Sequence, residues 1–213
     1  IGCGNGFYLD VYQKIGIPKN HIIGVDIAPR VIQRLKEKGF SAMCANILNL
    51  TLDDDVSDIT IAQGVIHHTS DPFKAFGELV RITKPGGYIY LNVYNKWHPY
   101  FYLVHRATWP IRYMYYNWSK RIVNVMYPFV YLVLQPLAWA AFGEFLDAKT
   151  GRALFMDQVI TPRAHLFSKS MLLSYAKKSN CTIQEFAYNR YYLMLATVIK
   201  VKDPPFTQGD NII

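Results

Sequence analysis

Two hydrophobic periods alternate along the first 95 residues and predict strands and helices in turn. Short, mostly apolar runs of strand length predict buried parallel strands over 21–26, 41–45, 58–64 and 88–93. Between these runs, apolar side chains recur at helical spacing. This alternation predicts an α/β fold with a doubly wound, mostly parallel, Rossmann-like sheet.

Three helices are predicted within this part of the chain. The first follows Gly6, and its expected core-facing side chains are Tyr8, Val11, Tyr12 and Ile15. The second begins at Pro29, and the third is capped by Asp71 and has Phe73 and Phe76 among its inward side chains. Pro85-Gly86-Gly87 is expected to end the third helix and turn into the next strand.

The chain opens with Ile-Gly-Cys-Gly-Asn-Gly, a glycine at every second position. Such a stretch is typical of a strand that turns tightly into a helix, where backbone approaches a nucleotide-like ligand. Asp26 follows about 20 residues later, the spacing at which an acid binds both ribose hydroxyls; its alternative role is to cap the next helix. The strand that should precede the glycines is absent, so we expect the sequence to be an N-terminally truncated fragment.

The C-terminal part, residues 168–213, predicts a return to the core fold. Ser168 is expected to cap a helix that ends at Asn180, and two strands over 182–188 and 192–201 are expected to form an antiparallel hairpin. Residues 96–167 between the two core parts form an insertion that is rich in tryptophan and tyrosine and is expected to be mainly helical.

The insertion differs from the core in its charged residues. The net charge of +8 indicates an acidic partner, and residues 96–143 hold Lys96, Arg106, Arg112, Lys120 and Arg121 with no acidic residue. Residues 122–143 hold no charged side chain, so they predict a buried lid, a helix on a membrane surface, or a membrane span. Asn124, Pro128 and Pro136 are expected to interrupt a regular span.

The three cysteines lack CxxC spacing and are expected to be reduced, mostly buried thiols of a cytosolic protein. Adjacent His67 and His68, with no third ligand nearby, do not predict a zinc site, and no metal is expected.

Taken in order, IGCGNG, GVDIAPRVIQRLKEKG, ANILNL, DITIAQGVIHHTSDPFKAFGELVRITKPGG and YIYLNVYN resemble the class I S-adenosylmethionine-dependent methyltransferases. The branch that contains the ubiquinone and menaquinone C-methyltransferases is the most similar. The resemblance covers nearly all of residues 1–95. It implies S-adenosylmethionine as the cofactor, and an insertion over the open end of the sheet that forms the acceptor pocket.

The resemblance also implies a residue set for the cofactor. The glycines would wrap the methionine moiety, Asp26 would bind the ribose, and Ile27 and Asn46 would contact the adenine. Residues 63–65 would lie near the transferable methyl group. The complete implied set is Gly2, Cys3, Gly4, Asn5, Gly6, Asp26, Ile27, Asn46, Ile47, Gln63, Gly64 and Val65.

The acceptor side is expected near the ends of the next strands. His68 is a candidate for contacting substrate or taking a proton, with a structural role in the turn as the alternative, and Tyr94 is expected to border the same pocket. Asp157, Gln158 and His165 flank the insertion. They are expected to anchor it, and a role in catalysis is the alternative.

The sequence therefore predicts a methyltransferase acting on a small or lipophilic acceptor such as a quinone, a lipid or a secondary metabolite. One alternative is a noncatalytic module that binds a membrane or a protein through the aromatic insertion; another, less favoured, is an RNA methyltransferase, which would bind RNA with a steep salt dependence. We expect a cytoplasmic protein, with peripheral membrane contact through residues 96–143 as an alternative.

Overall fold

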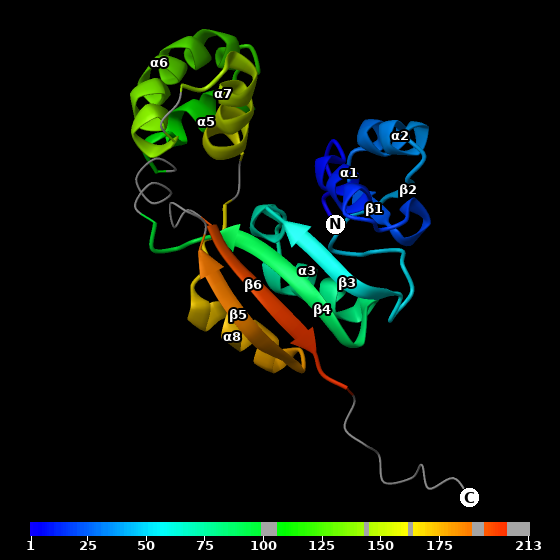
Figure 1. Cartoon of the computed structure of the whole chain (residues 1–213). Coiled ribbons are helices and arrows are strands. Elements are labelled where there is room, and N and C mark those ends of the chain that lie inside the picture. The colour runs from blue at the N-terminus through cyan, green and yellow to red at the C-terminus, as the bar shows by residue number, and fades with distance from the viewer. Residues whose placement is uncertain (99–105, 143–144, 162–163, 189–193, 204–213) are drawn as a thin grey trace, which may run out of the picture.

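The computed structural model describes residues 1–98, 106–142, 145–161, 164–188 and 194–203. Two groups of strands make up the sheet (Figure 1). β1 (Ile23–Asp26) pairs in parallel with β2 (Ser41–Cys44). A four-stranded sheet has the order β3-β4-β6-β5, with β3 (Ser57–Gln63) parallel to β4 (Thr83–Tyr94).

The stretch Ile1–Cys3 lies between the two groups. The Ile1 nitrogen donates a hydrogen bond to the carbonyl of Ile61 in β3 at 2.7 Å, and the Cys3 nitrogen donates to the carbonyl of Val25 in β1 at 3.0 Å. The Gly-rich turn is thereby held between β1 and β3. Val25 and Ile61 lie towards the carboxyl ends of β1 and β3, so the turn lies at the end of these strands where α/β sheets bind their ligands.

The C-terminal hairpin completes the sheet as expected. β6 (Met194–Val201) is antiparallel both to β4 and to β5 (Cys181–Tyr188). The preceding helix α8 (Lys169–Lys178) begins after Ser168, whose side chain accepts from the Met171 nitrogen, and Asn180 takes the left-handed conformation with φ 52°. The predicted cap at Ser168 and the predicted left-handed residue Asn180 are therefore both confirmed.

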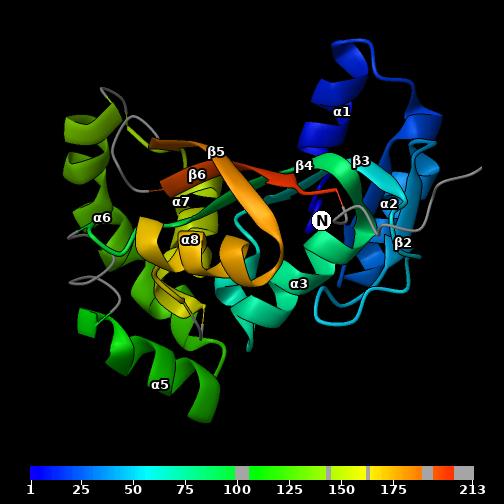
Figure 2. The same cartoon turned by 90° about the horizontal axis from the view of Figure 1, so that it is seen from below.

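α3 (Pro72–Ile82) and α8 lie on the same face of the four-stranded sheet in both views (Figures 1 and 2). Their apolar side chains and the inward side chains of the strands form the main core, which includes Phe76, Leu79 and Leu172. Asp71 caps α3 as predicted, accepting from the Lys74 nitrogen at 2.9 Å. Phe73, expected to face the core, is instead exposed and packs edge-on against Tyr175.

α1 (Phe7–Lys14) and α2 (Pro29–Glu37) lie beside β1, and short 3-10 turns, η1 (Lys19–His21) and η2 (Ile66–His68), occupy two of the loops. The predicted face of α1 was wrong, because Leu9 is its buried residue while Tyr8 and Ile15 are exposed. Leu9 packs on Leu35 of α2 and on Phe40. The first helix therefore turns an aliphatic side chain inward and leaves Tyr8 at the edge of the site.

Pro85-Gly86-Gly87 is part of β4 and not a turn before it. α3 ends at Ile82, and β4 begins at Thr83 with a register shift against β3 between Ser57 and Ile59. A side chain at Gly87 would place its Cβ 2.8 Å from the carbonyl oxygens of Asp58 and Lys84. Glycine is required there because the backbones approach too closely for a Cβ.

The insertion folds into helices at one end of the molecule, away from β1 and β2 (Figures 1 and 2). These are α5 (Trp109–Asn117), α6 (Ile122–Phe142), α7 (Ala148–Leu154) and a π-helical turn, η3 (Phe155–Ile160). Asn95 and Phe167 form a β-bridge, and the Lys96 nitrogen donates to the Phe167 carbonyl at 2.8 Å. The segment between them leaves the sheet and returns to it at one point.

One expectation about the insertion was wrong. Pro128 and Pro136 do not interrupt the uncharged segment, because both lie inside the single helix α6. Arg112, one of the basic residues of the insertion, is buried and donates to Thr108 Oγ1 and to the Val159 carbonyl. Burial lowers the pKa of the Arg112 guanidinium. No helix in the described part of the chain is long and apolar enough to cross a membrane.

The cysteines are less uniformly buried than expected. Cys181 is buried, Cys3 is half-buried and Cys44 is exposed, and all three are free thiols. Burial raises the pKa of Cys181 to about 11, so this thiol stays protonated at neutral pH.

Candidate functional site

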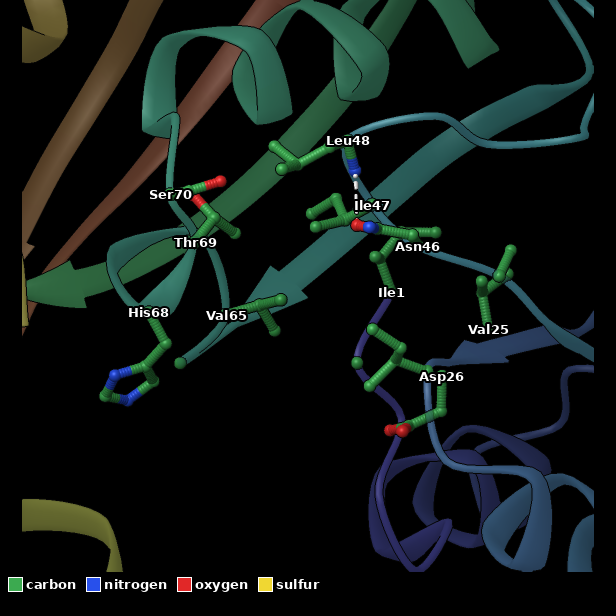
Figure 3. A pocket seen from close by; sticks show the side chains of 14 residues that line it. Ile1, Val25, Asp26, Asn46, Ile47, Leu48, Val65, His68, Thr69 and Ser70 are labelled. Carbon is green, nitrogen blue, oxygen red and sulfur yellow. Dashed lines mark hydrogen bonds between the residues drawn. The ribbon is translucent and has the colours of Figure 1, made fainter. Parts of the chain in front are cut away.

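A cavity of about 430 Å³ opens at the carboxyl ends of β1, β2 and β3 (Figure 3). Its wall is formed by Ile1, Gly2, Val25, Asp26, Ile27, Ala45, Asn46, Ile47, Leu48, Gly64, Val65, His68, Thr69 and Ser70. The wall is mostly apolar, with polar groups at opposite sides: Asp26 on one and His68 on the other (Figure 3). A cavity of this size and lining suits a drug-sized organic ligand.

Asp26 ends β1 and points its carboxylate at the Gly-rich turn. Oδ2 accepts from the Gly4 nitrogen at 2.9 Å, and Oδ1 accepts from the Ala28 nitrogen at 3.0 Å. These two bonds fix the rotamer of the carboxylate. Because a carboxylate offers about four acceptor positions, each oxygen keeps capacity for a ligand hydroxyl on the cavity side. The side chain of Asp26 does not cap α2, because Ala28 is the N-cap residue and no side chain caps the helix; the bond to the Ala28 nitrogen holds the residue that precedes α2. The expected role of Asp26 at the ribose stays a prediction.

The glycines serve two different needs. At Gly2, with φ 65°, a Cβ would lie 2.4 Å from Val65 Cγ2, so glycine allows the turn to pack on β3. At Gly4 and Gly64 the φ angles are 49° and 74°, and a Cβ would meet no protein atom within 4 Å. Open space beside these two backbone positions leaves room for a ligand to lie against the main chain.

The loop after β2 forms a second side of the cavity. Ile47 is buried, Ile27 stands at the rim with 68% of its surface exposed, and Asn46 lies between them. Asn46 Oδ1 accepts from the Leu48 nitrogen at 3.0 Å (Figure 3), so this side chain orders its own loop. Its expected contact with the adenine amino group therefore has to share an oxygen that already accepts one hydrogen bond.

α3 braces this loop through Arg81 and Glu78. Arg81 donates to the carbonyls of Leu50 and Leu52 at 3.0 and 2.8 Å, and Glu78 accepts from the Leu50 nitrogen at 2.7 Å. Arg81 also forms ion pairs with Glu78 and Asp54 at 3.0 and 2.6 Å. The acidic run at residues 53–55 is thus tied to the helix through Asp54.

Histidines and a tyrosine gather where β3 and β4 end. His68 lines the cavity, whereas His67 is buried and stacks on Tyr94 with ring centroids 3.9 Å apart. Tyr94 was expected to border the pocket, but it does not line the cavity and is only 4% exposed. The stack on His67 turns the ring into the interior, where its edge faces His68.

Known proteins resemble the N-terminal part of the chain most strongly. Residues 1–91 match the family described as "Methyltransferase domain". A tRNA (carboxymethyluridine(34)-5-O)-methyltransferase of Arabidopsis thaliana is 36% identical over 96 residues, which are 44% of this chain and 22% of that protein. The human "Probable tRNA methyltransferase 9B" is 34% identical over 97 residues, 44% of this chain and 20% of that protein.

The fold comparison extends over nearly the whole chain. A SAM-dependent methyltransferase from Methanosarcina mazei superposes with a TM-score of 0.59 at 20% identity, covering 95% of this chain and 91% of the other. The family match and the shared fold together support a methyltransferase domain of the class I S-adenosylmethionine-dependent type over residues 1–91. The family resemblance and the expected α/β fold are thereby confirmed.

The match to the family model ends at residue 91, before the start of the insertion. The segment aligned with the two tRNA methyltransferases spans only about a fifth of the length of those curated relatives. Residues 96–167 must therefore be interpreted from their own structure.

Within the methyltransferase domain, five residues of the implied cofactor set do not line the cavity. Cys3 turns its side chain into the core between α1 and β1, Asn5 points to solvent, and buried Gly6 begins α1 with φ 80°. Gln63 donates to the Tyr8 hydroxyl at 2.7 Å. Gly4 contributes its backbone nitrogen to Asp26.

Sequence reasoning missed several wall residues. Thr69 and Ser70 extend the loop after His68, and Leu48 follows Asn46. Their positions directly after predicted strands could have indicated them, since ligands bind at the carboxyl ends of parallel strands. The Tyr8 contact could not be foreseen, because it joins positions 55 residues apart.

His165 links the insertion to the loop that carries His68. Its backbone nitrogen donates to the His67 carbonyl at 2.8 Å, and its Nε2 lies 3.1 Å from the Thr69 carbonyl oxygen, which requires the proton on Nε2. The anchoring expected of His165 is confirmed. The side chains of Asp157 and Gln158 lie outside the described residues.

Replacing His165 with alanine should loosen this link without disturbing the cofactor side. Losing one side-chain hydrogen bond to a partly buried carbonyl costs about 1 kcal/mol. A loss of about 1 kcal/mol corresponds to several-fold in affinity, so we expect the KM for the acceptor to rise several-fold. The Kd for S-adenosylmethionine should stay within about twofold of the native value. Steady-state kinetics with separate calorimetry of cofactor binding measures both.

The matched control is His165→Gln, whose amide nitrogen can donate to the same carbonyl and should restore the KM. An equal loss in both variants would show that His165 does not act through the Thr69 carbonyl.

Among the described residues, no three His, Cys, Asp or Glu side chains are grouped to hold a metal ion. The polar side chains that line the cavity, among them Asp26, Asn46 and His68, suit an organic cofactor that has hydroxyl and amino groups. The open backbone at Gly4 and Gly64 and the oriented carboxylate of Asp26 fit the shape and the ribose hydroxyls of S-adenosylmethionine.

Proposed function

We propose that this protein transfers a methyl group from S-adenosylmethionine to a lipophilic acceptor. The observation that carries the cofactor half is the Asp26 carboxylate, which is held by two backbone nitrogens at the wall of an apolar cavity. The observation that supports the acceptor half is the aromatic insertion, which is anchored through His165 to the loop of His68, Thr69 and Ser70.

When bound, S-adenosylmethionine supplies an electrophilic methyl group on a sulfonium. The protein has to orient the acceptor for in-line attack and keep water from the site. Ile47, Leu48 and Val65 provide an apolar wall for this purpose. His68 lies in the wall, and its imidazole can take the proton that an oxygen or nitrogen acceptor loses.

The cofactor-binding residues divide between the two ends of the cavity. Asp26 and Ile27 at the end of β1 are proposed to hold the ribose and the adenine, with Asn46 and Ile47 beside them. Gly2, Gly4, Gly64 and Val65 are proposed to surround the methionine part. His68 lies on the side away from Asp26 (Figure 3), where the acceptor would enter.

A second candidate function is methylation of RNA. The relatives in Arabidopsis and human are named as tRNA methyltransferases, and the chain has a net charge of +8. The lipophilic acceptor is favoured because the exposed surface of the insertion is dominated by large apolar side chains, including Trp109, Phe129 and Leu132. RNA binding would instead call for basic side chains along this apolar surface, and α6, which carries Phe129 and Leu132, has none.

The test supplies both acceptors together. The protein is incubated with S-adenosylmethionine carrying a labelled methyl group, a detergent-dispersed total lipid extract and bulk tRNA, and label is counted after solvent extraction. We expect label in the solvent phase, and no label with Asp26→Ala. Label only in the RNA would establish the second candidate, and absence of both label and cofactor binding would establish the noncatalytic alternative.

A further inference from the structure

Burial divides α6 into two faces. On one face, Val123 packs with Phe155 and Val159 of the π-helical turn, and Tyr127 lies against Phe155. On the other face, Val125, Phe129, Leu132, Val133 and Trp139 are each between 58% and 68% exposed. Their spacing of i, i+4, i+7, i+8 and i+14 places them on one side of the helix.

This apolar face offers few side-chain groups that could form a hydrogen bond with a partner. Asn124, at its edge, already accepts from Arg152 Nη2 at 2.9 Å through its Oδ1. Pro128 and Pro136 are exposed on the same side, and neither has a backbone N–H to donate. A protein interface of this area would ordinarily include several hydrogen bonds, whereas the acyl region of a lipid layer requires none.

The approach to α6 carries aromatic and positive side chains. Trp118 is 74% exposed, and Lys120 and Arg121 are exposed directly before the first residue of the helix. The sequence holds no acidic residue between Asn95 and Glu144 to oppose them. Tryptophan beside lysine and arginine is typical of a segment at the headgroup level of an anionic membrane.

The position of the helix leaves this face accessible. α6 lies in the group of helices at one end of the molecule, away from β1 and β2 (Figures 1 and 2). Among the described residues, one side of α6 packs on protein, so the other side can lie flat on a surface.

We propose that α6 is an interfacial helix that binds the protein to the surface of an anionic lipid membrane. Val125, Phe129, Leu132 and Val133 enter the boundary between headgroups and acyl chains, while Trp118, Lys120 and Arg121 contact the headgroups. This inference goes beyond methyl transfer and does not depend on it. It also supplies a route for a lipophilic acceptor, which would reach the site from the membrane.

The experiment is flotation of the full chain with vesicles of phosphatidylcholine alone and of phosphatidylcholine mixed with phosphatidylglycerol. We expect the protein to float with the mixed vesicles, and the fraction bound to fall about tenfold in the double variant Phe129→Glu/Leu132→Glu. Lys120→Glu/Arg121→Glu should lower binding to the mixed vesicles only, and salt should weaken binding of the native protein. Leu173→Glu, on α8, is the matched control, because the Leu173 side chain is also exposed, with 51% of its surface accessible. Binding of this variant to vesicles should equal that of the native protein.

The altered residues are exposed, so thermal midpoints should match that of the native protein. Cofactor binding by all variants should be unchanged, which separates this test from the test of methyl transfer. Failure of the native protein to float, or an equal loss in Leu173→Glu, would overturn the proposal. It would also be overturned if the Phe129/Leu132 variant only abolished a dimer of this chain, or if tRNA bound α6 in place of vesicles.

Discussion

Replacing Asp26 with alanine is expected to weaken S-adenosylmethionine binding by about 100-fold, because each hydrogen bond to a charged acceptor contributes about 1.5–3 kcal/mol and the ribose offers two hydroxyls. The substitution also frees the Gly4 and Ala28 nitrogens, which donate to this carboxylate at 2.9 and 3.0 Å. Isothermal titration calorimetry measures the loss.

Asp26→Asn separates the charge from the hydrogen bonds. Its amide oxygen keeps one acceptor, so we expect a loss of about tenfold, between the native protein and the alanine variant. Thermal unfolding without cofactor shows whether the fold survives. Binding by Asp26→Ala within about twofold of native, in a folded protein, would remove Asp26 from the cofactor site.

Replacing Arg81 with alanine is expected to lower the free energy of unfolding by about 3 kcal/mol, since a single guanidinium holds two loop carbonyls and two carboxylates. The loop that carries Asn46 and Ile47 loses its brace on α3. We therefore also expect weaker S-adenosylmethionine binding, measured by calorimetry beside urea unfolding.

Two further variants provide smaller expected losses of stability for comparison with Arg81→Ala. Arg81→Lys keeps the charge but cannot span the same partners, so it should recover only part of the stability. Lys84→Ala removes the exposed ion pair with Asp58 at 2.8 Å and should cost less than about 1 kcal/mol. Equal losses in Arg81→Ala and Lys84→Ala would contradict the bracing role.

The hydrogen bond between Arg81 and Glu78 also predicts how the stability difference between native protein and Arg81→Ala depends on pH. The hydrogen bond from Arg81 holds the pKa of Glu78 below its ordinary value of 4.5. A lowered carboxyl pKa contributes stability above the unfolded pKa and loses it as the pH falls through the folded one. The stability gap between native protein and Arg81→Ala should therefore narrow below about pH 4.5.

The local signals in the sequence predicted the framework of the methyltransferase domain well. Asp71 and Ser168 begin helices, Asn180 ends one in the left-handed conformation, and the last two strands form the antiparallel hairpin. Each of these features depends on a few neighbouring residues. Asp26 at the end of β1 belongs with them, because a strand end and its spacing from the glycines are both visible in the chain.

Features that depend on packing between distant segments were predicted less well. α1 shows apolar or aromatic residues on more than one side, and only contact with Leu35 and Phe40 selects Leu9 as the inward residue. Tyr94 was expected in the pocket, but its ring is buried and stacks on the ring of His67. Pro128 and Pro136 are tolerated within α6 because they lie on its exposed side, where the freed carbonyls can meet solvent.

The alternating fold, the Gly-rich turn and the acid that faces it could be predicted from the sequence, because hydrophobic periodicity, glycine spacing and strand ends are local features of the chain. The structure was needed to show which implied residues line the cavity, how Arg81 holds its loop, and which face of α6 is exposed. Those outcomes depend on contacts between residues far apart in sequence, and on the competition of several apolar faces for one core.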